Sequence, residues 1–395
     1  MKRTKYISQT MTQRISAFCT LALLTSLTPF KAVAANEENS SSIKAAPNVT
    51  VTVYATGLNN PRGLKFGPGG DLYVAEGGMG GVNSTVGMCT QVMPPVGPYT
   101  ANVTGARISR IDRQGVRTTV ADNLPSNQTS ADSGSLVSGV ADVAFVGNTL
   151  YAILSGAGCS HGVPDIPNAV IRVRGNGTWD LIADLSEFQM THPVINPPVG
   201  DFEPDGTWYS MLALRINEHD NNNNGGGNAD LYAVEPNHGE LDKITTSGEV
   251  SRIADISASQ GHSVPTALAF NNGNFYVGNL NVFPIVDGSS KILKITPSGQ
   301  TTVFAEGFTT VVGLVFDRMN RMYVLENTTG GNPFPTPGTG DVVRVDPSGN
   351  RTVIVTGLVL PTGMTIAHDG TLYVSNVGFG PPPNGLGQVL KIQVP

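Results

Sequence analysis

The chain has 395 residues, with 24 Lys and Arg against 30 Asp and Glu. An acidic balance disfavours nucleic acid as a partner, because phosphates attract basic surfaces. Beyond residue 27 no apolar run approaches the roughly 18 residues of a transmembrane helix, so we expect no membrane span.

The first 34 residues have the pattern of a secretory signal peptide. Basic residues precede an apolar run over 15–27, and Ala-Val-Ala at 32–34 provides a small-residue cleavage site. We therefore expect an exported protein, periplasmic or extracellular. Residues 35–47 are small and polar, which predicts a disordered lead-in.

A short phrase with an aromatic at its second position occurs six times in the remaining chain. Its Tyr or Phe and its β-branched neighbours favour β-strands, and Gly, Pro, Asn and Asp turn signals separate the apolar segments. Five of the six copies close on a carboxylate or an amide. The copies are LYVAE (72–76), LYAIL (150–154), LYAVE (231–235), FYVGN (275–279), MYVLE (322–326) and LYVSN (372–376).

The phrase belongs to a longer unit of four predicted strands. From residue 313 the unit reads GLVFDRMNRMYVLEN, a loop, DVVRVDPSG and RTVIVTG. Tyr276, Tyr323 and Tyr373 are 47 and 50 residues apart, which fits one four-stranded propeller blade per repeat. The earlier spacings are longer because those units contain insertions. Residues 48–395 are therefore predicted to form an all-β, six-bladed β-propeller.

The ends of this region predict how the ring closes. The last unit stops after its third strand, at 388–394, whereas an otherwise unassigned strand occupies 51–57. Pairing of the two completes the sixth blade and removes open sheet edges. The alternatives are an open β-sandwich array or two domains.

Loops after the second strand of each blade, and the turns between blades, should lie on one face, because strands alternate in direction. We call this the upper face and expect binding residues there, since the loops are long and rich in Gly and Pro. The loops after the second strands are 77–105, 155–168, 280–290, 327–340 and 377–387.

Two cysteines remain after the leader, Cys89 and Cys159. An even pair in an exported chain favours a disulfide over free thiols, and the two lie in upper-face loops of adjacent blades. Two cysteines are too few for a structural zinc site, which takes four ligands.

The residues that close the phrase form a predicted ring at the propeller mouth. Their oxygen atoms suit a hard cation such as calcium. The alternative is that each caps a turn by accepting backbone N–H bonds. Leu154 breaks the ring, so any site should be asymmetric, with the second blade contributing through its loop. The tentative metal ligands are Glu76, Glu235, Asn279, Glu326 and Asn376.

Three histidines and one arginine are candidate ligand-binding residues on the upper face. His161, His238 and His262 fall in Gly-rich turns or between blades, and Arg62 is placed to hold an anionic group. The alternatives are hydrogen-bonding turn residues and a loop brace. The segment 218–232, which includes the Asn-rich 221–224, matches only the start of a calcium loop, at Asp220, Asn222, Asn224 and Gly225. It joins two strands on the opposite face, which favours a flexible insertion.

Several motifs together resemble the ScyD/ScyE family of exported propeller proteins. They are NPRGLKFGPGGDLYVAEGG (60–78), CTQV (89–92), GPYT (97–100), GCSHG (158–162), DFEPDGTWYSM (201–211), YAVEPNHGEL (232–241) and HSVPTALAF (262–270). The resemblance implies a six-bladed propeller related to NHL-repeat and SMP-30-like propellers. It transfers no catalytic residues, and the Asn-rich insertion departs from the usual pattern.

Two functions follow as hypotheses. The first is a binding or accessory module for a small molecule, a glycan or an exported protein partner. The alternative is a calcium-dependent lactonase or esterase of the SMP-30-like class, in which a bound cation activates water. No nucleophile elbow, Walker loop or dinucleotide fingerprint occurs, so the catalytic residues of such an enzyme are unknown.

Overall fold

The computed structural model describes residues 43–200, 202–216, 229–380 and 385–395. The predicted signal peptide, its cleavage site, residues 35–42 of the lead-in and the Asn-rich segment 221–224 lie outside the described residues. Within the described ranges, no helix has the length and apolarity needed to cross a membrane.

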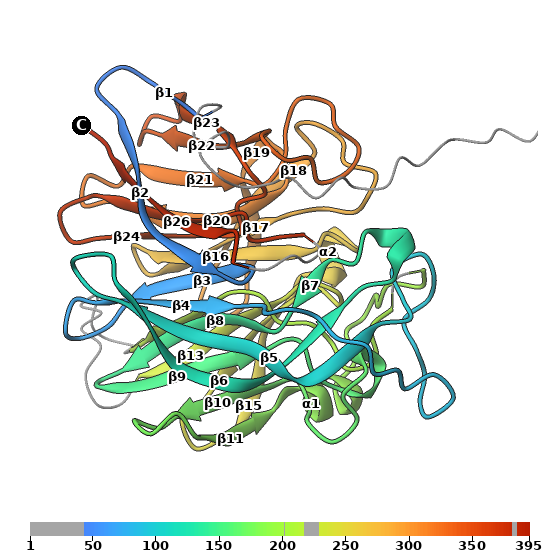
Figure 1. Cartoon of the computed structure of the whole chain (residues 1–395). Coiled ribbons are helices and arrows are strands. Elements are labelled where there is room, and N and C mark those ends of the chain that lie inside the picture. Colours follow the sequence, from blue (N-terminus) through green and yellow to red (C-terminus); the bar gives the residue numbers. More distant parts are fainter. Residues whose placement is uncertain (1–42, 201, 217–228, 381–384) are drawn as a thin grey trace, which may run out of the picture. The chain divides into compact units, whose positions relative to one another are not determined.

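The strands form antiparallel sheets of four or five strands, which are the blades of a six-bladed propeller (Figure 1). Blade 1 contains β3 (Pro61–Phe66), β4 (Leu72–Glu76), β5 (Thr100–Ile111), β6 (Arg117–Gln128) and the short β7 (Val137–Ser138). Blade 2 contains β8 (Val140–Val146), β9 (Thr149–Leu154), β10 (Ala169–Val173) and β11 (Trp179–Asp184). Blade 3 contains β12 (Met211–Leu214), β13 (Asp230–Glu235), β14 (Glu240–Ile244) and β15 (Val250–Asp255).

The second half of the ring repeats the same order, and the predicted fold is confirmed. Blade 4 contains β16 (Pro265–Asn271), β17 (Asn274–Asn279), β18 (Ser290–Ile295) and β19 (Thr301–Phe308). Blade 5 contains β20 (Val311–Phe316), β21 (Met322–Glu326), β22 (Gly340–Val345) and β23 (Arg351–Leu358). Blade 6 contains β24 (Gly363–Ile366), β25 (Leu372–Asn376), β26 (Gly387–Gln393) and β2 (Thr50–Leu58). The short helices are η1 (Ala131–Ser133), η2 (Cys159–His161), α1 (Leu185–Thr191) and α2 (Ser257–Gln260).

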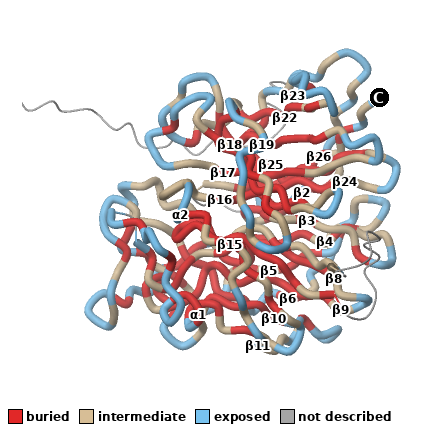
Figure 2. The backbone as a smooth tube through the Cα atoms, turned by 180° about the vertical axis from the view of Figure 1, so that it is seen from behind, coloured by how far each residue is buried: buried red, intermediate tan, exposed pale blue. Residues whose placement is uncertain are grey.

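The repeated phrase is the second strand of every blade, and its aromatic packs between blades. Tyr73 contacts Phe145 of blade 2 edge-on, with ring centroids 4.9 Å apart. Tyr373 contacts Phe66 of blade 1 in the same way at 5.2 Å. Each ring thus joins its blade to the first strand of the next one, which explains why the position recurs. Figure 2 shows that buried residues follow the strands and exposed ones the loops.

The N-terminal strand closes the ring as predicted. β2 pairs antiparallel with β26, with Val51 opposite Ile392, and Figure 1 shows the blue strand beside the red one. β1 (Lys44–Ala45), which falls within the predicted lead-in, pairs with β23 at the outer edge of blade 5.

The predicted division into two faces follows from the strand register. Glu76 at the end of β4 lies opposite Pro61 at the start of β3, so loops after second strands and turns between blades share the upper face. The first of these loops is shorter than predicted and ends at residue 99. β5 begins at Thr100 because 100–102 pair with 126–128 of β6.

Candidate functional site

The residues that close the second strands act as hydrogen-bonding caps for the turns between blades. Glu76 accepts a bond from the N–H of Asn59, and Asn376 accepts one from Val359 at 2.8 Å. Glu235 accepts one from Thr207 at 2.7 Å, and Glu326 one from Thr309. Asn279 donates to the carbonyl of Ser263 at 2.8 Å.

In each case the bonded turn leads into the first strand of the same blade. The side chains therefore satisfy backbone groups of separate turns, and the oxygen of Asn279 accepts a bond from the N–H of Lys291 at 2.6 Å. Within the part of the chain that the structure describes, no group of three or more His, Cys, Asp or Glu is placed to hold a metal ion. The calcium site at Glu76, Glu235, Asn279, Glu326 and Asn376 stays a prediction.

The predicted disulfide is confirmed, because Cys89 and Cys159 are bonded to each other. It joins the loop after β4 in blade 1 to the loop after β9 in blade 2. The hydroxyl of Thr85 also donates to the carbonyl of Cys159. The first long loop is therefore fastened to the turn that contains His161.

That turn is a short 3₁₀ helix, η2, between two glycines with positive φ. Asp205 accepts bonds from the N–H of Ser160 at 2.7 Å and from its hydroxyl at 2.6 Å. A Cβ on Gly158 would lie 2.4 Å from the Asp205 carboxyl carbon, so glycine is required there for this approach. The turn thus packs closely against the segment between blades 2 and 3, which contains Asp205.

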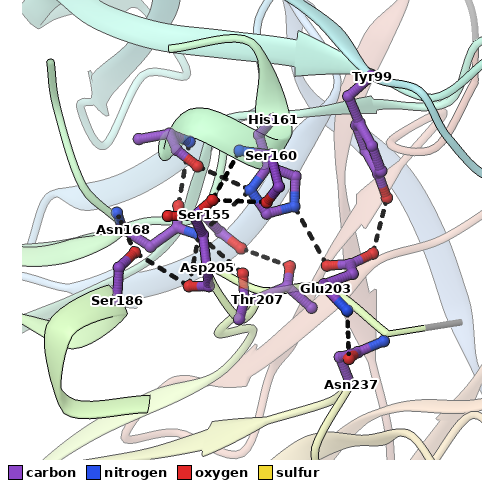
Figure 3. A network of polar contacts seen from close by, with 12 residues as sticks. Tyr99, Ser155, Ser160, His161, Asn168, Ser186, Glu203, Asp205, Thr207 and Asn237 are labelled. Atoms are coloured by element: carbon purple, nitrogen blue, oxygen red, sulfur yellow. Dashed lines mark hydrogen bonds and ion pairs between the residues drawn. The ribbon is translucent and has the colours of Figure 1, made fainter. Parts of the chain in front are cut away.

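Glu203 belongs to the polar network in Figure 3, where it lies between Tyr99, His161 and Asn237. One carboxylate oxygen accepts a bond from the Tyr99 hydroxyl at 2.9 Å, and the other lies 3.2 Å from Nε2 of His161. The N–H of Glu203 donates to the Asn237 side chain at 2.9 Å. The network therefore joins blades 1, 2 and 3 on the upper face.

This geometry favours the protonated form of His161. Its Nδ1–H donates to the carbonyl of Ala157 at 2.7 Å, which leaves Nε2 directed at Glu203. Burial by itself lowers the pKa of His161, but the Glu203 hydrogen bond and charge outweigh it, so the pKa is raised above its usual value. The contact between His161 and Glu203 is buried, with the imidazole 1% exposed.

His238 and His262 extend this group toward blade 4. His238 is buried against the ring of Phe202, at a centroid distance of 5.2 Å, and its Nδ1 lies 3.4 Å from Glu235. Burial opposes the charge of His238, but Glu235 raises its pKa overall. For His262 burial prevails and lowers the pKa, even though the charges of Glu235 and Glu203 act on it. Nδ1 of His238 has the Glu235 carboxylate as its ion-pair partner, whereas Nε2 of His262 is buried and has no hydrogen-bond partner among the residues that the structure describes.

Arg62 makes a different set of contacts. It is 4% exposed, and its guanidinium donates to the carbonyl of Val137. The same group lies 6.0 Å from the ring centre of Tyr209 and 5.1 Å from that of Phe379. In the structure the charge of Glu203 thus acts on His161, His238 and His262. Arg62 instead lies against two aromatic rings.

Sequence reasoning missed Glu203, Asp205 and Tyr99 as site residues. All three lie in motifs used for the family resemblance, GPYT and DFEPDGTWYSM. The available signal was the pair of acids, two residues apart, in a segment that topology places on the upper face. Tyr99 is 104 residues away from Glu203 in the chain, and nothing local indicates that contact.

A second buried acid pair lies in blade 5. Glu326 at the end of β21 is opposite Asp341 of β22. Burial and the neighbouring Asp341 raise the pKa of Glu326 to about 9, and burial raises that of Asp341 to about 6. The two carboxyl groups therefore share a proton at neutral pH.

Comparison with known proteins supports the fold. No family model matches the chain, and no curated protein matches it. Among solved structures it is similar to a gluconolactonase from Xanthomonas campestris, with TM-score 0.52, 10% identity, and coverage of 89% of this chain and 91% of that one. Others are a PQQ-bound aldose sugar dehydrogenase from Streptomyces coelicolor (TM-score 0.48, 14% identity, 89% and 99% coverage) and a virginiamycin B lyase from Staphylococcus aureus (0.45, 12%, 88% and 100%).

At these identities the similarity shows the fold alone. The class of protein is a six-bladed β-propeller closed by its N-terminal strand.

Proposed function

We propose that the protein is an exported β-propeller that binds a hydroxylated small molecule, such as a sugar or the end of a glycan, on its upper face. The site is the group of Glu203, His161, His238 and His262, which we call the Glu203 cluster. One observation supports it above others. Glu203 contacts His161, its charge also acts on His238 and His262, and Nε2 of His262 is buried with no hydrogen-bond partner in the described part of the chain.

The chemistry of the cluster favours hydroxyl groups. Carboxylate oxygens of Glu203 accept hydrogen bonds, whereas a neutral His262 has one donor and one acceptor nitrogen. A hydroxyl provides both roles, and a buried polar atom without a partner is stabilised when a ligand supplies one. Glu203 lies 3.2 Å from His161 and Glu235 lies 3.4 Å from His238, so each of these imidazoles already faces a carboxylate and is not available to an anionic ligand. Phe202, 38% exposed and in contact with His238, offers an apolar surface to the C–H face of a sugar ring.

The calcium-dependent lactonase or esterase remains the second hypothesis. The residues that would hold its cation already accept bonds from turn N–H groups, so a cation would compete with those bonds. Membership of the ScyD/ScyE family and export are likewise part of the proposal. They rest on sequence motifs and on the leader pattern.

The test is isothermal titration calorimetry of the mature protein against neutral mono- and disaccharides and polyols. We expect saturable binding by at least one of them and a loss of affinity of about tenfold or more in Glu203→Gln, because a charge-assisted bond is lost. Gln keeps the shape and can still accept the Tyr99 bond. His368→Ala is the matched control, since His368 is exposed in a lower-face turn of blade 6. Unchanged affinity in Glu203→Gln, or no binding by any neutral hydroxylated compound, would contradict the proposal.

A further inference from the structure

The propeller axis contains a cavity of about 190 Å³ that includes no residue of the Glu203 cluster. The first strands of all six blades contribute to its walls, from Lys65 of β3 and Asp142 of β8 to Ile366 of β24. A dry cavity of about 150 Å³ lined by Leu, Ile and Phe admits benzene. The axial cavity is therefore large enough for one aromatic ring with a small substituent.

The two ends of the cavity differ in chemistry. Near the upper ends of their strands, the hydroxyl of Tyr209 donates to the carbonyl of Thr362 at 2.8 Å and links blades 3 and 6 across the axis. The lower ends of the first strands contribute apolar side chains, Phe270, Phe316 and Ile366 among them, each half-buried. A ligand would therefore enter from the lower face with its apolar part against these side chains.

Lys65 is the charged group in the wall that a ligand can use. Its ammonium lies 3.3 Å from Asp142, and its side chain is 25% exposed, against 2% for Asp142. Both oxygens of Asp142 are engaged, because they accept the N–H groups of Val143 and Met211 at 2.8 and 2.9 Å in addition to Lys65. An ammonium has three donors, of which Asp142 uses one.

The charged groups that line the cavity are balanced. Among the described residues, Lys65 is the one cation and Asp142 the one acid in its wall, whereas Arg62 is not part of the lining and lies beside Tyr209 and Phe379. Because both oxygens of Asp142 are engaged, the remaining donors of Lys65 are left for a ligand. An ammonium donor forms its strongest hydrogen bond with a charged acceptor, such as a carboxylate.

We propose that the axial cavity is a second binding site, which takes a small monocarboxylate with an apolar body about the size of one aromatic ring. The ligand carboxylate lies at the Lys65 ammonium and the apolar body contacts the side chains of the lower wall. This site is separate from the Glu203 cluster, where charge favours a neutral hydroxylated ligand. Its ligand therefore differs in class, size and face of entry.

Calorimetry with benzoate, benzyl alcohol and benzylamine tests the charge requirement. We expect benzoate to bind and the neutral and cationic analogues to bind about tenfold more weakly or worse, since a charge-assisted hydrogen bond is absent. Lys65→Met should weaken benzoate by a similar factor. Lys243→Met is the matched control, because it breaks another Lys–Asp pair, with Asp230 at 2.8 Å, outside the cavity. Equal binding of benzoate and benzyl alcohol would overturn the proposal, as would the absence of benzoate binding.

Two further measurements test the proposal even if Lys65→Met does not fold. Ile366→Trp places a ring in the lower part of the cavity and should abolish benzoate binding without affecting sugar binding at the Glu203 cluster. A crystal soaked with 4-bromobenzoate should show its anomalous bromine signal between β16, β20 and β24. Bromine located only outside the cavity, or benzoate binding unaffected by Ile366→Trp, would refute the site.

Discussion

Replacing Glu326 by Gln should remove a pH-dependent part of the stability. The carboxyl groups of Glu326 and Asp341 are buried opposite each other, 6% and 9% exposed, and Thr309 donates its N–H to Glu326. Because the pKa of Glu326 is raised to about 9, this group stays protonated in the folded protein at neutral pH. In the unfolded chain it is ionised above its ordinary pKa of 4.5.

The direction of the effect follows from proton binding. Between about pH 4.5 and about pH 9 the folded state holds a proton that the unfolded state has released, so the free energy of unfolding falls as the pH rises. One proton corresponds to about 1.4 kcal/mol per pH unit. From pH 6 to pH 8 the contribution of Glu326 is therefore a loss of about 3 kcal/mol. Gln resembles the protonated acid and does not titrate, so Glu326→Gln should lose less stability over this interval.

The measurement is urea unfolding of wild type and variant at pH 6, 7 and 8, with the midpoint and slope determined at each pH. The difference in the free energy of unfolding between wild type and variant at each pH separates the contribution of Glu326 from that of other buried acids. Glu240 is one of these, because burial and Glu235 raise its pKa to about 7. Glu306→Gln is the control, because Glu306 is an exposed acid, with its side chain 64% exposed. If Glu326→Gln destabilised the protein equally at pH 6 and pH 8, the shared proton would be refuted.

Two other predictions concern the upper face. Replacing Cys89 and Cys159 together by Ser should lower the free energy of unfolding by up to about 4 kcal/mol, because the disulfide closes a long loop in the unfolded chain. Urea unfolding of the double variant measures this loss, and an unchanged midpoint would be inconsistent with a stabilising disulfide. Calcium should not raise the melting temperature relative to an EDTA control, because the oxygens of Glu76 and Glu235 already accept several bonds; a calcium-dependent rise in a thermal-shift assay would instead support the cation site.

The fold could be predicted because its information is local and repeated. Each copy of the phrase sets one strand, its spacing sets the blade, and the unmatched first and last strands leave one way to close the ring. The first loop was harder to delimit. Residues 100–102 extend β5 only because they pair with 126–128, and that pairing is interrupted by bulges that no turn signal in the sequence indicates.

The candidate site was predicted only in part, because its centre is defined by contacts between distant segments. Topology predicted His161, His238 and His262 on one face, and in the structure the charge of Glu203 acts on all three, while their role in binding stays a prediction. Nothing local in the sequence distinguishes Glu203 from other acids. Its role follows only from the contacts of its two oxygens with Tyr99 and His161. The buried pairs Lys65–Asp142 and Glu326–Asp341 are likewise products of packing between strands.

The one copy of the phrase without a polar end explains why the second blade differs from the others. Where other blades fasten the preceding turn with a carboxylate or amide, blade 2 has Leu154. It keeps the backbone bond that blades 1, 4, 5 and 6 also make, from the N–H of Ser155 to the carbonyl of Gly139 at 2.7 Å, but lacks the side-chain bond. Leu154 cannot hydrogen-bond with the loop that follows, because its side chain is apolar. That loop is fastened from outside its own blade, by Cys89 of blade 1 and by Asp205 from the segment before blade 3. The same segment supplies Glu203 to His161, so the break in the repeat lies where three blades join to form the Glu203 cluster.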